Sequence, residues 1–167
     1  MNWHDFSREA PELARLGEER FDGAGLALIG TLRKDGRPRI SPLEPLIAHG
    51  ELYLGMMWRS RKALDLLRDQ RCAVHSVVSK SDASEGEFKL CGRVRNVDDP
   101  AERERCADAY EAKIAWRPVE PYHLFALDIE EASYIKSDGE KQRVIRWRPG
   151  RAAWTADRRW DGSGYVD

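Results

Sequence analysis

Apolar positions in the first third of the chain change their spacing from that of a helix to that of strands. Helical spacing over residues 7–21, with Ser7 at the N-cap, predicts one N-terminal helix. Extended apolar runs follow at Leu26–Leu32, Ile40–Ile47 and Leu52–Met57, separated by Asp35-Gly36 and His49-Gly50. Asp-Gly between extended runs favours a hairpin, because both central turn residues need positive φ. Three antiparallel strands are therefore predicted, and the prolines of the second make it an edge or bulged strand.

The remaining pattern alternates strands with two more helices. A short helix begins after Ser60 with Asp65 and Asp69 expected to face water, and Asp99-Pro100 is typical of the start of a second helix. Further strands are predicted at residues 71–79, 88–97, 122–137 and 141–149, with a bulge at Gly92. The segment from Gly150 is predicted to be irregular. Six or seven antiparallel strands with peripheral helices indicate a mainly β protein built on a small barrel.

Length and charge narrow the class of protein. The 167 residues suit one domain, which we divide into a helix (1–23), a barrel (24–148) and a tail (149–167). Lys and Arg number 28 against 29 Asp and Glu, so the charge of −1 gives no general attraction to nucleic acid or anionic lipid. No apolar run approaches the roughly 18 residues of a membrane span, and the first residues lack the features of a signal peptide. Three separated cysteines indicate thiols in a reducing compartment, so a cytoplasmic protein is expected.

Cations gather where the short helix begins. Arg59, Arg61 and Lys62 surround Ser60, although the dipole of a helix favours negative charge at this end. Such a cluster is stable when a polyanion such as a phosphate binds between the cations. The alternative is a solvated basic face on which Arg61 and Lys62 pair with Asp65, and composition alone favours that alternative.

The preceding strand adds polar groups of the same kind. Arg37, Arg39 and Ser41 alternate along it and fall on one face. If this strand pairs with the next one across the His49-Gly50 turn, Arg39 and Ser41 converge on the cationic helix start. The two segments together predict a polar site for a phosphorylated ligand.

These motifs resemble those of one family. The order "DGRPRISP", "GELYLG", "SRKALDL" and "FKLCGRVRNVDDPAER" is similar to that of the pyridoxamine 5'-phosphate oxidase-like, flavin-binding split-barrel proteins over about residues 24–148. The resemblance implies a split β-barrel and a homodimer with two cofactor sites at the subunit interface. It further implies that FMN, the expected cofactor, is bound by the following residues: Arg39, Ile40, Ser41, Pro42, Met56, Met57, Ser60, Arg61, Lys62, and, from the partner subunit, Lys89 and Trp147.

The resemblance implies an oxidoreductase that transfers a hydride or electrons to a small molecule, with no catalytic side chain assigned. The C-terminal sequence "RWRPGRAAWTADRRWDGSGYVD" does not match the segment with which the authentic oxidase binds pyridoxal phosphate, so vitamin B6 is not the expected substrate. A deazaflavin, FAD or haem are alternative cofactors, and a carrier without turnover is an alternative to an enzyme. Arginines interleaved with Trp147, Trp154 and Trp160 leave single-stranded nucleic-acid binding as a further, less favoured alternative.

Overall fold

The computed structural model describes residues 1–82 and 84–166. These residues form four helices, α1 (Trp3–Glu9), α2 (Pro11–Ala24), α3 (Arg61–Arg68) and α4 (Pro100–Ile114). They also form ten strands: β1 (Ala27–Leu32), β2 (Pro38–Leu43), β3 (Pro45–Ala48), β4 (Glu51–Met57), β5 (Arg71–Ser76), β6 (Glu87–Asn96), β7 (Tyr122–Ser137), β8 (Lys141–Trp147), β9 (Trp154–Trp160) and β10 (Tyr165–Val166). The prediction of a mainly β, antiparallel fold is confirmed, with more strands than the six or seven expected.

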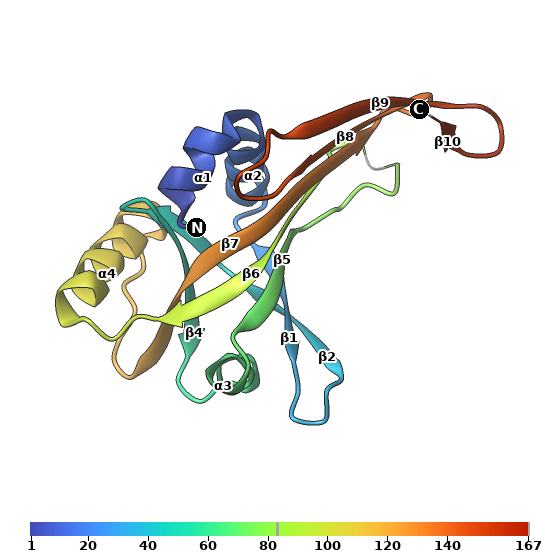
Figure 1. Ribbon diagram of the computed structural model, residues 1–167. Helices are drawn as coiled ribbons and strands as arrows, with labels where there is room; N and C mark the ends of the chain where they lie inside the picture. Colours follow the sequence, from blue (N-terminus) through green and yellow to red (C-terminus); the bar gives the residue numbers. More distant parts are fainter. Residues whose placement is uncertain (83, 167) are drawn as a thin grey trace.

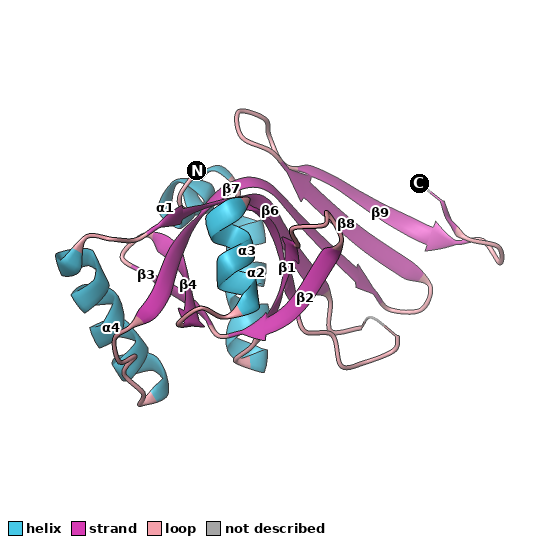
Figure 2. Cartoon of the chain, turned by 90° about the horizontal axis from the view of Figure 1, so that it is seen from below, coloured by secondary structure: helices cyan, strands magenta, loops and turns pink. Residues whose placement is uncertain are grey.

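All ten strands belong to one antiparallel sheet in the order β10-β9-β8-β7-β6-β5-β1-β2, and β3 and β4 branch from it. The branch arises at β7, whose first part (122–126) pairs with β4 and whose last part (132–137) pairs with β8, while β6 runs along its other edge. The sheet is not closed. Instead, α3 contacts both β1 and β4 and so lies between the β3–β4 branch and the β1–β2 hairpin (Figure 2).

A bulge bends the long ribbon of β6 and β7. The register shifts between Cys91 and Gly92, which confirms the predicted bulge. A Cβ atom on Gly92 would lie 2.0 Å from the carbonyl oxygen of Asp128, a distance that no side-chain rotation relieves because both atoms belong to the backbone. Glycine is therefore required at this position of the bulge, where the backbone of β7 leaves no room for a Cβ atom.

Gly92→Ala should lower the free energy of unfolding by about 1–3 kcal/mol or more, the range for overpacked interiors. Gly23→Ala is the matched control, since Gly23 lies in α2 and a Cβ there meets nothing within 4 Å. Urea unfolding of both variants checks the prediction. Equal unfolding midpoints for the two variants would show that the bulge tolerates a side chain.

The N-terminal segment forms two helices, so the prediction of a single helix capped by Ser7 is wrong. Asn2 caps α1 by accepting a hydrogen bond from the amide of Asp5, and Ser7 lies inside this helix. Pro11 begins α2, because proline lacks the N–H that a continuous helix needs and suits a first turn. Both helices pack against β7, beside the ribbon that β8 and β9 form (Figure 1).

The second predicted strand is in fact two strands. It breaks at Glu44, so that β2 pairs with β1 while β3 pairs with β4 across the His49-Gly50 turn. Arg39 and Ser41 lie on β2, so the expectation that their strand pairs directly with the one leading to α3 is wrong. A hydrogen bond stabilises the chain at this break, because the hydroxyl of Tyr110 on α4 donates to the carbonyl oxygen of Glu44.

The C-terminal segment was predicted to be irregular, but it forms two strands, β9 and β10. Strand β9 pairs with β8 from Arg146–Trp154 to Lys141–Arg159, and β10 pairs with β9. The apolar pattern missed β9 because most of its residues are exposed and none belongs to the core. Backbone pairing with the edge of β8, not burial, holds this strand in the sheet.

Candidate functional site

The start of α3 carries unsatisfied hydrogen-bonding groups. Ser60 occupies the N-cap position, but its side chain makes no capping hydrogen bond. Its hydroxyl oxygen is buried and has no partner among the described residues. The first amides of a helix likewise have no carbonyl partner within the helix. Just before it, Arg59 holds a φ of 54°, a backbone conformation that is uncommon away from glycine and concentrates at functional sites.

A basic pocket of about 630 Å³ lies on one side of α3. Its lining consists of Arg33, Lys34, Asp35, Arg39, Arg61, Leu64, Asp65 and Arg68, which gives five cations and two carboxylates. The predicted neighbours Arg39 and Arg61 therefore share one pocket, although they come from a strand and a helix that are not adjacent in the sequence.

Asp65 lies beneath the basic pocket and is buried, so the expectation that it faces water is wrong. Its carboxylate accepts hydrogen bonds from Thr31 Oγ1 (3.0 Å), Arg39 Nε (2.6 Å) and Arg68 Nη2 (3.2 Å). Burial acts to raise the pKa of this carboxyl, but hydrogen bonds from Arg39, Thr31 and Arg68 outweigh it and hold the pKa below the usual value. Because Asp65 is bonded to Arg39 and Arg68, the alternative in which it pairs with Arg61 and Lys62 is wrong.

An apolar pocket of about 820 Å³ lies on the other side of the helix start. It is lined by Leu26, Pro42, Leu43, Glu44, Gly55, Met56, Met57, Trp58, Lys62, Tyr110, Ile114, Trp116, Pro118, Val119, Pro121 and Tyr122. Lys62 is the one cation of this lining, and its ammonium donates a hydrogen bond to the carbonyl oxygen of Pro42. Burial lowers the pKa of Lys62, while the carboxylate of Glu44 acts in the opposite direction.

The structure therefore divides the predicted cations between two pockets. Arg61 faces the basic pocket, and Lys62 faces the apolar pocket together with Pro42, Met56 and Met57. Both methionines line the apolar pocket, although Met56 is 4% exposed and Met57 is 79% exposed.

The other predicted residues lie on β2 or farther away. Arg39 and Ser41 share the inner face of β2, whereas Ile40 is 73% exposed on the outer face. Lys89 and Trp147 line a third pocket with residues of β7, β8 and the segment after β8. Within one chain, neither of these two residues lines a pocket beside α3. The ring of Trp147 is buried and packs against that of Phe6 at 4.9 Å.

A comparison with models of protein families shows which family the chain belongs to. Residues 17–136 match the family model described as pyridoxamine 5'-phosphate oxidase, which is more than half of the sequence. The chain belongs to this family. No curated protein matches the sequence.

Solved structures agree with the family. The chain is similar to a haem-binding protein from Mycobacterium smegmatis, with a TM-score of 0.60 and 17% identity over 80% of this chain and 57% of the other, so it spans little more than half of that protein. A protein from Clostridium acetobutylicum related to general stress protein 26 matches with a TM-score of 0.57, 19% identity, and coverages of 87% and 96%. An FMN-binding, pyridoxamine 5'-phosphate oxidase-related protein from Nostoc punctiforme matches with a TM-score of 0.61 and 13% identity, over 89% of this chain and 95% of the other. At these identities the similarities establish the fold.

Sequence reasoning missed the aromatic residues of this family member's apolar pocket. Trp58 and Trp116 are 54% and 56% exposed, and both line it. Trp58 could have been predicted as a site residue, because it lies directly between an apolar strand and three cations, where neither a helical nor a strand pattern accounts for an apolar side chain. Trp116 could not have been predicted, because it reaches the pocket only through the way α4 is placed in the fold.

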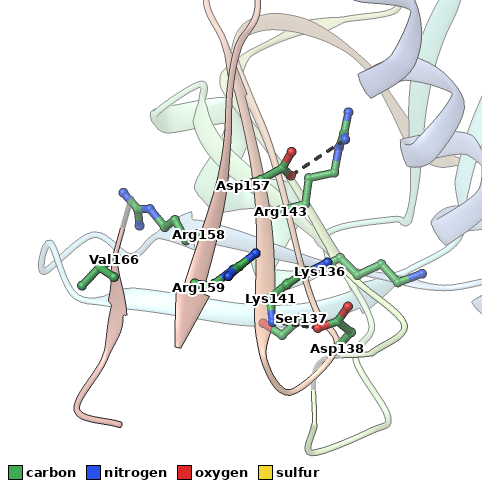
Figure 3. Close-up of a pocket in the computed structure, with 9 residues that line it drawn as sticks. All are labelled: Lys136, Ser137, Asp138, Lys141, Arg143, Asp157, Arg158, Arg159 and Val166. Carbon is green, nitrogen blue, oxygen red and sulfur yellow. Dashed lines mark hydrogen bonds and ion pairs between the residues drawn. The ribbon is translucent and has the colours of Figure 1, made fainter. Parts of the chain in front are cut away.

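A further basic cluster lies on the ribbon formed by β7, β8 and β9. Figure 3 shows Lys136, Lys141, Arg143 and Arg159 along this ribbon, with Asp157 beside Arg143 in an ion pair at 3.9 Å. Arg143 also bonds to Glu12 of α2 at 2.8 Å, so part of this charge holds the ribbon against the N-terminal helices.

Among the described residues, no cluster of His, Cys, Asp and Glu could hold a metal ion, and no helix is long and apolar enough to cross a membrane.

Proposed function

We propose that this protein binds FMN and acts as an oxidoreductase on a small molecule. The observation that carries the proposal is the buried hydroxyl of Ser60, which has no partner among the described residues and directly precedes Arg61 of the cationic pocket and Lys62 of the apolar pocket. Buried polar groups in proteins are nearly always hydrogen-bonded, and a bound ligand would complete the hydrogen bonds of this hydroxyl. The hydroxyl, the free amides of the helix and the side chains of Arg61 and Lys62 fit a phosphoryl group.

The remaining predicted contacts follow the same arrangement. Residues Arg39–Pro42 of β2 and the pair Met56 and Met57 of β4 would border the ribityl chain and the ring, since Pro42 and both methionines line the apolar pocket. A bound flavin supplies two-electron chemistry, so the protein has to bind, orient and shield it and needs few catalytic side chains. The unit proposed to hold it is residues 24–148.

A homodimer is part of the proposal. Lys89 and Trp147 line a pocket separate from α3, so only a second copy could bring them to this cofactor site. Light scattering should report twice the mass of the 19.2 kDa chain. A monomer with intact FMN binding would remove Lys89 and Trp147 from the site and leave the contacts of α3 in place.

The absorbance spectrum of the purified protein, before and after addition of FMN, tests the proposal. A flavin spectrum that stays with the protein through gel filtration is the expected result, and turnover of NAD(P)H or a reduced deazaflavin with a dye acceptor would separate an enzyme from a carrier. A haem spectrum would favour the haem carrier, an alternative supported by the similarity to the mycobacterial haem-binding protein. A colourless protein that does not bind FMN but retards single-stranded RNA in a gel would overturn the proposal. It would favour nucleic-acid binding by the exposed Trp154 and Trp160 on β9.

A further inference from the structure

We propose that the part of the apolar pocket next to α4 binds an aromatic small molecule that carries no phosphate or carboxylate. If the proposed function is correct, this aromatic molecule is the substrate of the oxidoreductase, and that part of the inference rests on the proposed function. It concerns the walls formed by Trp58, Ile114, Trp116 and Val119, none of which the cofactor proposal uses.

Two braced tryptophans support an aromatic ligand. Trp58 stacks on the imidazole of His123, with ring centroids 4.6 Å apart and an angle of 13° between the planes. Trp116 contacts the ring of Tyr110 edge-on at 6.3 Å. Each tryptophan thus contacts a neighbouring ring, lines the pocket and is more than half exposed. Exposed aromatic rings gain free energy by stacking on another ring, and few other side chains offer a planar ligand as much contact area.

The shape of the pocket fits the same class of ligand. Ile114 and Val119, which are 43% and 80% exposed, extend the apolar surface beyond the indoles. A volume of about 820 Å³ lies within the range of small-molecule sites and exceeds what one flavin ring needs. Large apolar side chains exposed together around one hollow usually indicate a binding surface.

The charges around the pocket disfavour an anionic ligand. Lys62 is its one cation and belongs to the proposed phosphoryl site, and the other charged side chain in the lining is the carboxylate of Glu44. Three cations of the α4 region are bound to carboxylates, in the pairs Lys113–Asp22 (2.7 Å), Arg117–Asp108 (2.6 Å) and Arg103–Glu120 (2.6 Å). A phosphate or carboxylate placed here would lose its hydration without gaining a counter-ion.

Binding of 2-naphthol and 2-naphthyl phosphate to the FMN-loaded protein tests the inference, since the two probes share a ring and differ in the phosphate. Calorimetry should show 2-naphthol binding at least about 10-fold more tightly than its phosphate ester. Trp58→Ala and Trp116→Ala should each weaken 2-naphthol binding by about 10-fold, the effect of losing one aromatic contact and its buried area. Trp160→Ala, which removes an indole of similar exposure from β9, is the control.

The outcomes separate this inference from the proposed function. Tighter binding of the phosphate ester, release of FMN by saturating 2-naphthol, or equal effects of all three substitutions would each overturn the inference while FMN binding stands. If the protein does not bind FMN, the proposed function fails, and the same titrations on the protein as purified still test the pocket. A loss of 2-naphthol affinity confined to Trp58→Ala and Trp116→Ala would then support the aromatic site by itself.

Discussion

Replacing both Arg61 and Lys62 with alanine should weaken FMN binding on the order of 100-fold or more. Each side chain can donate charge-assisted hydrogen bonds to a phosphoryl group, and such bonds contribute roughly 1.5–3 kcal/mol each. Two of them amount to about 3–6 kcal/mol, or on the order of 10² to 10⁴ in the dissociation constant. Arg61 and Lys62 line different pockets but would bind the same phosphoryl group, so the losses measured in the two single variants should not simply add up to the loss in the double variant.

Quenching of flavin fluorescence during titration measures this dissociation constant. Arg8→Ala combined with Arg15→Ala removes the same charge from α1 and α2 and should leave FMN binding within about twofold, since screened charges far from the site contribute little. An unchanged constant in the Arg61 and Lys62 variant would remove both residues from the cofactor site. A similar loss in the control variant would indicate a general effect of net charge.

Asp65→Asn should lower the free energy of unfolding by about 3 kcal/mol, the lower end of the range for breaking a buried ion pair. The substitution leaves Arg39 facing a neutral amide inside the protein. The side chain of Asp65 is 6% exposed and that of Arg39 is 23% exposed, so Arg39 recovers part of its hydration and the loss stays near the lower limit. The amide can still accept the hydrogen bond from Thr31.

The effect of Asp65→Asn should depend on pH. The pKa of Asp65 in the folded protein lies below its ordinary value of 3.8, so its stabilisation is fully present above that value. As the pH falls below 3.8 and through the folded pKa, the wild-type carboxylate is protonated and the stability difference from Asp65→Asn should shrink.

Urea unfolding at neutral pH and at successively lower pH values measures both effects. Asp69→Asn is the control, because Asp69 closes the same helix but pairs with Arg71 at the surface, where an ion pair contributes little. If Asp65→Asn and Asp69→Asn unfold at the same urea concentration, the buried network is not a source of stability. A stability difference that grows toward low pH would contradict the lowered pKa.

Local chemistry determined many of the elements. Asp35-Gly36 and Asp138-Gly139 turn the chain between antiparallel strands, and in each pair the glycine alone holds a positive φ, 80° at Gly36 and 91° at Gly139. Asp99 caps α4 through the amides of Ala101 and Glu102, with Pro100 in the first turn. The start of α3 after Ser60 was also predicted from the order of residues. These features depend on neighbours within a few positions, so the sequence contains their whole physical cause.

The tertiary structure decided the features that depend on distant partners. Asp65 is buried because Thr31 and Arg39, 34 and 26 residues away, satisfy its charge, and helical periodicity alone placed it in water. The tail became β9 because the edge of β8 offered unpaired backbone groups. The cations of α3 serve two pockets because consecutive helical residues point about 100° apart and different strands stand on each side. The sequence by itself determined that a basic helix start follows an apolar strand; the fold decided which cation faces which pocket, since pockets are formed by segments that meet only when the sheet assembles.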